Sequence, residues 1–278
     1  MAPIALVTGT STGIGLSTAV QLAKAGFEVI ATLRNPEKAE HLRARAAAEG
    51  VQLDIRALDV ESDESVRQCV QGVLQRHGRI DVLVNNAGAG FRGSMEQTSP
   101  EALRRTMEVN FFGVWRVTQA VFPVMREQRS GRVISVSSLG GLIGQPFNDA
   151  YCAAKFAVEG FMESLAPVAE KLGIHISLIE PGPVSTEFVN NVLAANDGMT
   201  GELGPYRPLL EGYMSRLKGR YDGAQTGDDV AKIIVEVATT AQPHLRYLTS
   251  DALRGIARHK YADVTGDGVL ALTRTVIG

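Results

Sequence analysis

Apolar, β-branched runs alternate along the chain with segments in which apolar residues recur at helical spacing. Runs such as "IALV", "DVLV" and "ISLI" are almost continuously apolar, which is typical of strands that helices cover on both faces. The alternation predicts βαβ units in a parallel sheet. We expect seven strands, within residues 3–8, 27–33, 51–60, 81–86, 131–138, 174–181 and 245–251.

The segments between these runs predict at least six helices. Glycine and proline mark two irregular places, residues 139–146 and 196–208, and the second is the longest poorly patterned part of the chain. We find no internal repeat or linker, so the pattern predicts one α/β domain over 1–278 with a substrate-loop insertion at about 186–225. The helices are expected within 15–25, 36–49, 63–77, 100–128, 150–172 and the mixed segment 186–240.

Composition narrows the function classes. The 278 residues are 45% hydrophobic and 21% charged, which suits one globular domain with a sizeable core. The net charge is -2 with both signs interspersed, so nucleic acid is not an expected partner. We expect no signal peptide and no transmembrane segment, and therefore a cytoplasmic protein. Cys69 and Cys152 are expected to be reduced thiols, and no spacing predicts a metal site.

A glycine-rich turn, "TGTSTGIG" at 8–15, lies between the first predicted strand and the first helix. Free backbone N–H groups and the helix dipole at such a place bind a pyrophosphate. Glycines also make ordinary tight turns, but the position in the first βαβ unit favours a dinucleotide. The glycines at 9, 13 and 15 do not follow the common G-x-G-x-x-G spacing.

Tyr151 and Lys155 stand four residues apart in an alanine-rich segment, so they share a face if 150–172 is helical. A free phenol has a pKa near ~10, and a neighbouring ammonium lowers it toward the range useful for acid and base catalysis. Alone, such a pair is common on solvated helices. Ser138 lies thirteen residues upstream, at the end of the fifth predicted strand, where doubly wound sheets form ligand crevices.

The order T-G-x-x-x-G-x-G, "NNAG" at 85–88, Ser138 and Y-x-x-x-K resembles the short-chain dehydrogenase/reductase family over nearly the whole chain. The resemblance implies a Rossmann-like doubly wound sheet and four catalytic residues, Asn110, Ser138, Tyr151 and Lys155. In that family the serine binds the substrate oxygen, the tyrosine transfers the proton, the lysine holds the nicotinamide ribose and lowers the tyrosine pKa, and the asparagine anchors a water relay.

The same resemblance implies a nicotinamide cofactor. Arg34, after the second strand, is suited to a 2'-phosphate, so NADP(H) is favoured and NAD(H) remains possible. Asp59 is expected near the adenine, although alone it would be interpreted as a cap. The predicted cofactor-binding residues are Thr8, Gly9, Ser11, Thr12, Gly13, Ile14, Gly15, Arg34, Asp59, Val60, Asn86, Ala87, Gly88, Tyr151, Lys155, Pro181, Gly182, Val184 and Thr186.

A closer resemblance, carried by "GRVISVSSLGGLIGQPFNDAYCAAKFAVEGFMESLA" and "GIHISLIEPGPVSTEF", is to the estradiol-type 17β-hydroxysteroid dehydrogenases and their retinol dehydrogenase relatives. It implies interconversion of an alcohol and a ketone on a bulky, lipophilic substrate, with a 17β-hydroxysteroid favoured and retinoids or other lipophilic carbonyls as the alternative. The predicted substrate-binding residues are Ser138, Leu139, Leu142, Gln145, Asn148, Tyr151, Pro183, Val184 and Tyr213, with Phe147, Phe188, Val189 and Met199 as further apolar lining.

Other features limit these expectations. The segment "GYMSRLKGRYDGAQ" lacks the histidine with which the steroid enzymes bind the far steroid oxygen, so strict oestrogen selectivity is not expected. A non-catalytic NADP-sensing protein is the remaining alternative. The family also implies a homodimer, or a dimer of dimers, through the helices of Asn110 and Tyr151. We expect apolar outer positions there at Val114, Val117, Phe156 and Phe161.

Overall fold

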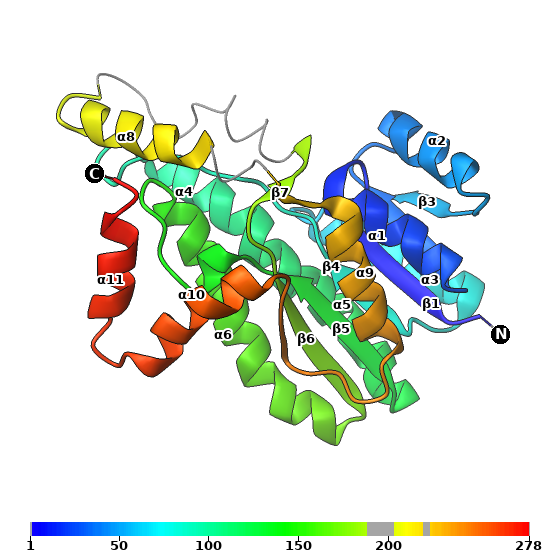
Figure 1. The fold of residues 1–278 in the computed structure, drawn as a ribbon. Helices are drawn as coiled ribbons and strands as arrows, with labels where there is room; N and C mark the ends of the chain where they lie inside the picture. Colours follow the sequence, from blue (N-terminus) through cyan, green and yellow to red (C-terminus); the bar gives the residue numbers. More distant parts are fainter. Residues whose placement is uncertain (1, 188–202, 219–222, 278) are drawn as a thin grey trace.

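The structure is a computed structural model that describes residues 2–187, 203–218 and 223–277. Within them, seven strands form one parallel sheet in the order β3-β2-β1-β4-β5-β6-β9 (Figure 1). The strands are β1 Ile4–Thr8, β2 Glu28–Leu33, β3 Asp54–Ala57, β4 Val82–Asn85, β5 Gly131–Val136, β6 Ile174–Glu180 and β9 Arg246–Leu248. All seven predicted strands are thereby confirmed.

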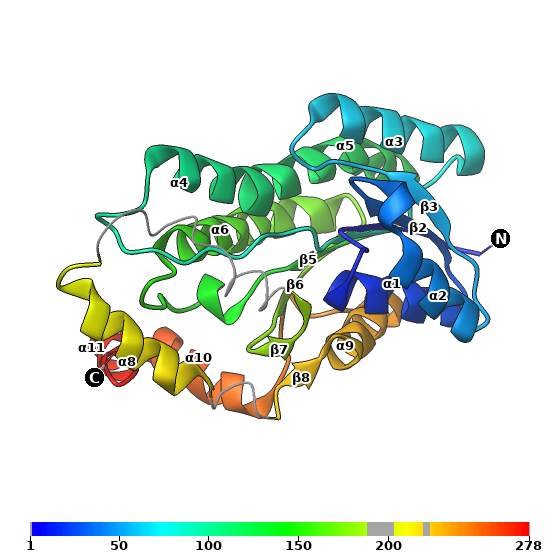
Figure 2. The ribbon, with the colours of Figure 1, turned by 90° about the horizontal axis from the view of Figure 1, so that it is seen from above.

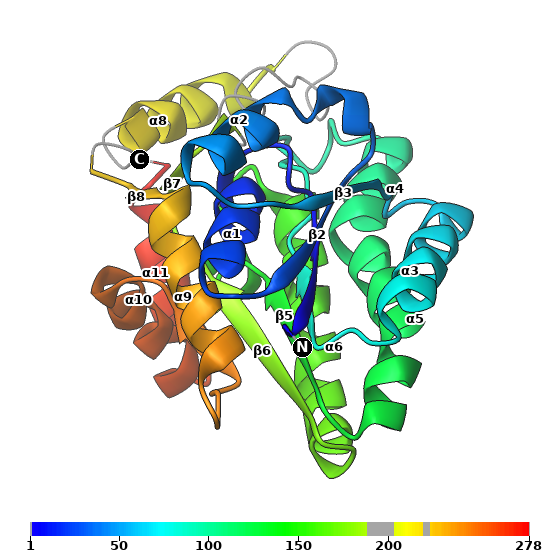
Figure 3. The same cartoon turned by 90° about the vertical axis from the view of Figure 1, so that its right-hand side faces the viewer.

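Two layers of helices cover the sheet (Figure 3). Helices α1, α2 and α9 pack on one face, and α3, α5 and α6 pack on the other. Their bounds are α1 Gly13–Lys24, α2 Glu40–Ala48, α3 Asp63–His77, α5 Gly113–Gln128, α6 Asp149–Lys171 and α9 Gly227–Thr239. This double covering explains the nearly continuous apolar strands, because both faces of each central strand are buried.

The helix ends carry ordinary stop and start signals. The Ser62 hydroxyl accepts from the Ser65 amide at the start of α3, and Gly78 ends that helix in the left-handed region at φ 71°. At the start of α9, Thr226 and Asp229 form a capping box. These local signals agree with the apolar pattern and mark both ends of α3 and the start of α9.

The strand order reverses around β1, which pairs with β2 on one side and β4 on the other. Chain connections from β1 and β4 therefore leave in opposite directions and open a crevice at the carboxyl ends of these strands, where doubly wound sheets bind ligands. The turn after β1, the "NNAG" turn after β4 and the loops after β5 and β6 all lie at this edge.

The segments beyond the central layers lie beside this edge. Helix α8 and the C-terminal end are neighbours in Figures 1 and 2, and Val276 packs in one cluster with Leu210 and Tyr213 of α8. A short parallel pair, β7 Val184–Ser185 with β8 Gln225–Thr226, lies beside the start of α9 (Figure 2). The remaining helices are η1 Pro36–Lys38, α4 Pro100–Met107, η2 Glu108–Phe112, η3 Leu139–Gly141, α8 Tyr206–Lys218, α10 Asp251–Ala262 and α11 Asp267–Arg274.

The structure refines several predicted helices. The helix expected over 36–49 begins at Glu40 after a short 3-10 turn, and the one expected over 100–128 is divided by a π-helical turn at 108–112. Part of the predicted loop insertion at 186–225 is the helix α8. Helices α10 and α11 had no predicted counterpart. Among the described residues, no helix is both long enough and apolar enough to cross a membrane.

The expectation of four outward apolar positions on α5 and α6 is partly wrong. Val114 and Val117 are buried in the core beneath the sheet, because they lie on the inner face of α5. Phe156 is exposed and Phe161 is half-buried against Trp115, with ring centroids 4.5 Å apart. The outward aromatic residues on α5 and the turn before it are Trp115 and Phe112, each 45% exposed.

Candidate active site

The glycine turn between β1 and α1 has the shape that a pyrophosphate cradle requires. Gly9 and Gly13 adopt φ of 71° and 59°, a region that other residues rarely enter. A Cβ on Gly15 would collide with the Gly9 carbonyl oxygen and the Asn86 amide nitrogen. Thr12 caps α1 without a side-chain hydrogen bond, and the first turn of α1 holds no acidic residue. The first amides of the helix are thus open to an anion, so the residues present fit a dinucleotide.

The "NNAG" turn is tied to the glycine turn. Asn86 Nδ2 donates to the carbonyl oxygens of Thr8 and Gly9, both at 3.0 Å. The backbone N–H groups of Asn86 and Ala87 both donate to Thr8 Oγ1 at 3.0 Å. The hydroxyl and carbonyl of Thr8 therefore fix the distance between the ends of β1 and β4. Sequence motifs that are 78 residues apart form one continuous rim.

Tyr151 and Lys155 lie one turn apart in the first half of α6, as the spacing predicts. The Lys155 Nζ is 5.7 Å from the centre of the Tyr151 ring. The lysine side chain is buried, with 4% of the residue exposed, and Nζ donates to the Val136 carbonyl oxygen at 2.9 Å. Burial lowers the pKa of Lys155 to about 8, and the charge of Glu159 opposes that shift.

Asn110 occupies the middle of the π-helical turn between α4 and α5 and is fully buried. Its Nδ2 donates to the carbonyl oxygens of Thr106 and Ala89, each at 2.9 Å, and its Oδ1 accepts from the Ala89 amide at 3.2 Å. A Cβ on Gly88 would lie 2.9 Å from Asn110 Oδ1 and 3.8 Å from Lys155 Nζ. Gly88 therefore stands between the two side chains and lets them approach.

Ser138 follows β5 and caps the short helix η3. Its Oγ accepts from the Gly140 amide at 3.0 Å, and the hydroxyl can still donate its own proton to a third group. A Cβ on Gly140 would lie 3.2 Å from Cε1 of Tyr151. The structure thus brings together the four side chains predicted as catalytic, in the succession Asn110, Gly88, Lys155, Tyr151, Gly140, Ser138.

The segment after β6 completes the rim above the glycine turn. The Pro181 carbonyl oxygen accepts from the Leu139 amide at 2.8 Å, which joins the loops after β5 and β6. Val184 is buried in β7. A Cβ on Gly13 would lie 3.2 Å from the Thr186 side chain, so that threonine sits directly over the glycine turn. The neighbouring Gly182 lies against Leu253 of α10.

The residues predicted for the adenosine half lie farther out. Arg34 follows β2 and is exposed, and among the described residues it has no ion-pair partner. The Asp59 Oδ1 accepts from the Glu61 amide at 3.1 Å, which is the capping role that the residue would have without a cofactor. Val60 is buried against Gly113. Ser11, Thr12 and Ile14 line the glycine turn without deep burial.

Several residues predicted to bind the substrate lie in or beside two apolar clusters. Leu139 and Leu142 are buried against Leu253 and Ala257 of α10. Phe147 packs with Leu210, Tyr213 and Val276, and the Tyr213 hydroxyl accepts from Asn148 Nδ2 at 3.0 Å. Gln145 and Pro183 are half-buried beside these clusters. Phe188, Val189 and Met199 lie outside the described residues.

The sequence analysis did not identify two charged residues near the site. Glu159 continues the Tyr151–Lys155 face of α6 by one more turn, and the four-residue spacing could have revealed it. Arg92, in the segment after the "NNAG" turn, is buried with Nη1 3.3 Å from Met214 Sδ of α8. Its place under α8 could not be read from the sequence, because α8 is more than a hundred residues away in the chain.

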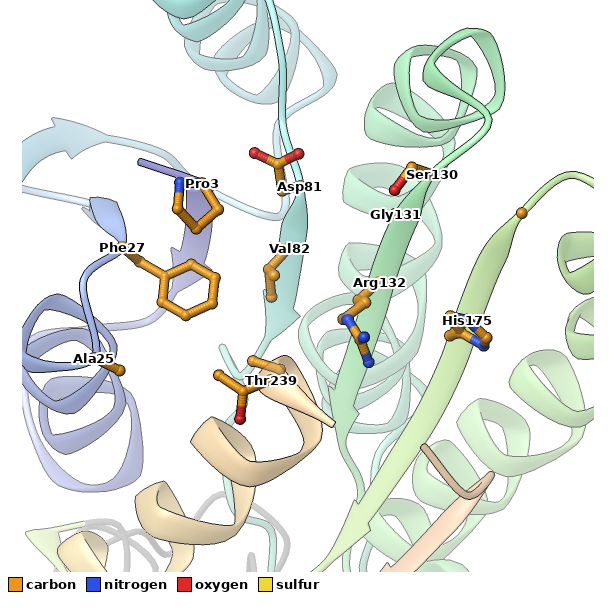
Figure 4. Close-up of a pocket in the computed structure, with 12 residues that line it drawn as sticks. Pro3, Ala25, Phe27, Asp81, Val82, Ser130, Gly131, Arg132, His175 and Thr239 are labelled. Atoms are coloured by element: carbon orange, nitrogen blue, oxygen red, sulfur yellow. The ribbon is translucent and has the colours of Figure 1, made fainter. Parts of the chain in front are cut away.

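Two further features of the described residues bear on where the site lies: a hollow at the other end of the sheet and a buried thiol. A hollow of about 400 Å³ lies at the amino ends of the strands, lined by Phe27, Asp81, Arg132 and His175 among others (Figure 4). It is at the sheet edge opposite to the glycine turn. In the described residues, no group of three or more His, Cys, Asp or Glu side chains could hold a metal ion. Burial raises the pKa of Cys152 to about 11, so this thiol beside Tyr151 is not a nucleophile at neutral pH.

Comparison with known proteins supports the family resemblance that the sequence motifs indicate. Residues 3–197 match a family model described as short chain dehydrogenase. Retinol dehydrogenase 8 of Bos taurus is 41% identical over 271 residues, covering 94% of this chain and 86% of its own. The 17-beta-hydroxysteroid dehydrogenase type 1 of Homo sapiens is 38% identical over 286 residues, covering 99% and 86%. The crystal structure of a short-chain dehydrogenase from Streptomyces avermitilis has a TM-score of 0.79 and 31% identity, covering 99% and 94%.

Proposed function

The chain belongs to the short-chain dehydrogenase family and is an NAD(P)-dependent oxidoreductase; on that premise we propose that it interconverts a secondary alcohol and a ketone on a bulky apolar substrate with NADP(H). The nicotinamide, when bound, gives or takes the hydride. The observation that carries the proposal is the convergence of Asn110, Ser138, Tyr151 and Lys155 around two glycines, within reach of the cofactor cradle.

Tyr151 is the proposed acid and base. When a carbonyl is reduced, its oxygen gains a proton as the carbon gains the hydride, and the phenol supplies that proton. The nearby Lys155 ammonium stabilises the phenolate that remains, because an opposite charge favours the ionised form. In alcohol oxidation the same groups work in reverse.

Ser138 and Asn110 are proposed to assist from either side. The Ser138 hydroxyl already accepts from the Gly140 amide, so its proton points to the next acceptor, which would be the substrate oxygen. Asn110 orders the backbone at Ala89 and stands on the far side of Gly88 from Lys155. Its proposed role is to anchor the path by which protons reach the lysine.

NADP(H) is the proposed cofactor because of Arg34. The guanidinium lies at the end of β2, is exposed, and would pair with a 2'-phosphate, whereas NAD(H) offers no such charge. Thr12, in the glycine turn, is proposed to contribute its hydroxyl to the same phosphate. NAD(H) stays the alternative that the experiment below must exclude.

A 17β-hydroxysteroid is the proposed substrate, with retinoids as the second candidate. Support comes from the relatives named retinol dehydrogenase 8 and 17-beta-hydroxysteroid dehydrogenase type 1. The apolar residues Leu139, Leu142 and Phe147, in the loop between Ser138 and α6, agree with a lipophilic substrate. The hydrogen-bonded pair of Asn148 and Tyr213 offers polar groups to a substrate oxygen.

The test is a panel of steroid, retinoid, simple carbonyl and sugar substrates, each with NADPH and with NADH, followed by the absorbance of the reduced nicotinamide. We expect turnover of lipophilic ketones with NADPH. Strong activity confined to small polar sugars would contradict the proposed substrate class. Binding of NADPH without turnover of any member would favour a cofactor-sensing protein.

A homodimer and a cytoplasmic location are further proposals from the sequence. Trp115 and Phe112 give α5 an exposed aromatic surface that a second copy could cover. Trp115→Glu should convert a dimer to a monomer in size-exclusion chromatography with light scattering. Leu103→Glu, on the exposed side of α4, is the control. A wild-type monomer would contradict the proposed dimer.

A further inference from the structure

A second charged cluster lies behind the proposed catalytic lysine. Tyr151, Lys155, Glu159 and Glu163 follow one another at four-residue spacing, so they form one stripe along α6. The stripe passes from the site into the core and out again, since Lys155 is 4% exposed and Glu159 6%, whereas the Glu163 side chain is 62% exposed. Two neighbouring charges, one positive and one negative, are thus buried together.

Arg246 of β9 contacts the carboxylates at the far end of this stripe. Its Nη2 is 3.2 Å from Glu159 Oε2 and 2.6 Å from Glu163 Oε2. Its Nε is 3.2 Å from Glu180 Oε1 at the end of β6. One guanidinium therefore faces three carboxyl groups. A buried group of this kind is stable only if its charges balance.

Glu180 is the most deeply buried of the three carboxyl groups. It is fully buried, and its Oε1 lies at ion-pair distance from Arg246 Nε, 3.2 Å, without forming a well-aligned hydrogen bond. Burial raises the pKa of Glu180 to about 8, and the charge of Glu159 adds to the effect. The Tyr261 phenol of α10 also faces the cluster, and burial raises its pKa as well. Burial therefore disfavours the charge of Glu180, and the less buried carboxylates of Glu159 and Glu163 share Arg246 Nη2.

Glu159 and Lys155 influence each other directly. Burial lowers the pKa of Lys155, and Glu159 is the group that opposes it. The pKa of Glu159 is raised overall, because the effect of burial exceeds the opposing effects of Ser137, Arg246 and Lys155. The Lys155 ammonium has a neutral hydrogen-bond acceptor in the Val136 carbonyl, and Glu159, one turn farther along α6, is the carboxylate whose charge opposes the effect of burial.

Taking the proposed role of Lys155 as its basis, we propose that Glu159 is a positioning residue that acts through Lys155. Its carboxylate keeps the buried ammonium protonated, and Arg246 in turn keeps that carboxylate ionised. Glu159 touches neither substrate nor nicotinamide in this scheme. It sets the pH range over which the lysine can hold the phenolate of Tyr151.

The direction of the effect follows from charge. Glu159→Gln removes the negative charge and keeps the size of the side chain, so Lys155 should lose its proton at a lower pH. A nearby opposite charge shifts a pKa by about one unit or more, so the midpoint should fall from near 8 by about one pH unit. Glu163→Gln is the matched control, because it removes an exposed carboxylate from the same Arg246 one turn farther from Lys155.

The first experiment measures Lys155 itself, in the full chain without substrate. The 13Cε shift of labelled lysine is titrated by NMR, and the Lys155 signal is assigned by its loss in Lys155→Met. We expect a lower midpoint in E159Q and a nearly unchanged one in E163Q and in the charge-conserving Glu159→Asp. If E159Q does not fold, Arg246→Gln serves as the second variant, since loss of the guanidinium disfavours the Glu159 carboxylate and should also lower the midpoint.

The second experiment measures carbonyl reduction against pH. Reduction needs the Tyr151 phenol and the Lys155 ammonium together, so activity falls when this pair loses its first proton. In E159Q the fall should move to lower pH by about one unit. An unchanged Lys155 midpoint in folded E159Q would overturn the inference. A lowered midpoint with an unmoved pH profile would uphold the role of Glu159 and contradict the catalytic role proposed for Lys155.

Discussion

Lys155 Nζ donates a 2.9 Å hydrogen bond to the carbonyl oxygen of Val136. Val136 is the last residue of β5, and Ser138 follows it by two positions. The lysine therefore joins α6 to the strand end that carries the serine. This contact sets the distance between the two halves of the proposed proton-transfer site, one on a helix and one on a loop, independently of any ligand.

The buried ammonium should make stability depend on pH. The pKa of Lys155 is lowered from 10.5 to about 8, so between these values the unfolded chain binds a proton that the folded chain does not. The contribution of Lys155 to the stability of the wild-type protein therefore rises with pH in this window. Lys155→Met removes this contribution. The unfolding free energy of Lys155→Met minus that of the wild type should therefore fall by about 3 kcal/mol as the pH rises from below 8 to about 10.5. Urea unfolding at several pH values measures it. A constant difference, like that expected of the exposed control Lys171→Met, would contradict burial of the charge.

Removing the phenol hydroxyl should stop turnover while the cofactor still binds. In Tyr151→Phe the ring stays beside Gly140 but no longer supplies a proton, and loss of general acid catalysis costs about 10²- to 10⁴-fold in kcat. Stopped-flow kinetics and the fluorescence of bound NADPH separate the two effects. Tyr247→Phe, which removes a phenol hydroxyl bonded to the His244 amide, is the control and should keep its activity. Retained turnover in Tyr151→Phe would remove this residue from the acid role.

Reversing the charge after β2 should change the cofactor preference. Arg34→Asp replaces a partner of the 2'-phosphate with a charge that repels it, and charged hydrogen bonds of this kind correspond to about 10- to 100-fold in affinity. The ratio of kcat/KM for NADPH and NADH should fall accordingly. Arg43→Asp on the exposed side of α2 makes the same change of net charge at another place. Equal shifts in both variants would mean that Arg34 does not bind the phosphate.

A single methyl group should damage the glycine turn. Alanine normally favours a helix over glycine by about 1 kcal/mol, but in Gly15→Ala the Cβ collides with the Gly9 carbonyl and Asn86, and overpacking costs about 1–3 kcal/mol. We expect lower stability and a larger loss of NADPH affinity, measured by thermal unfolding and by titration. Gly144→Ala is the control, because a Cβ there meets nothing within 4 Å. Normal cofactor affinity in Gly15→Ala would contradict the cradle.

The sequence predicted the sheet and the site well because both depend on local signals. Seven apolar runs became seven strands, and the pair Tyr151 and Lys155 lies on one face of α6 as the spacing requires. Val114 and Val117 were misplaced because an apolar residue at helical spacing can face the sheet or a partner, and only packing decides. Arg246 and Glu180 meet Glu159 across three elements, which no local pattern encodes.

The π-helical turn at Glu108–Phe112 affects more than Asn110. Helix α4 contacts α6, while α5 contacts β4, β5 and α3, so the two helices serve different surfaces. A wider turn is equivalent to one inserted residue and rotates one helix against the other by about 100°. Deleting one residue there would restore a regular helix but turn the outer side of α4 toward α6. The extra residue that directs Asn110 toward Gly88 therefore also lets α4 and α5 pack on two surfaces that a single regular helix could not face at the same time.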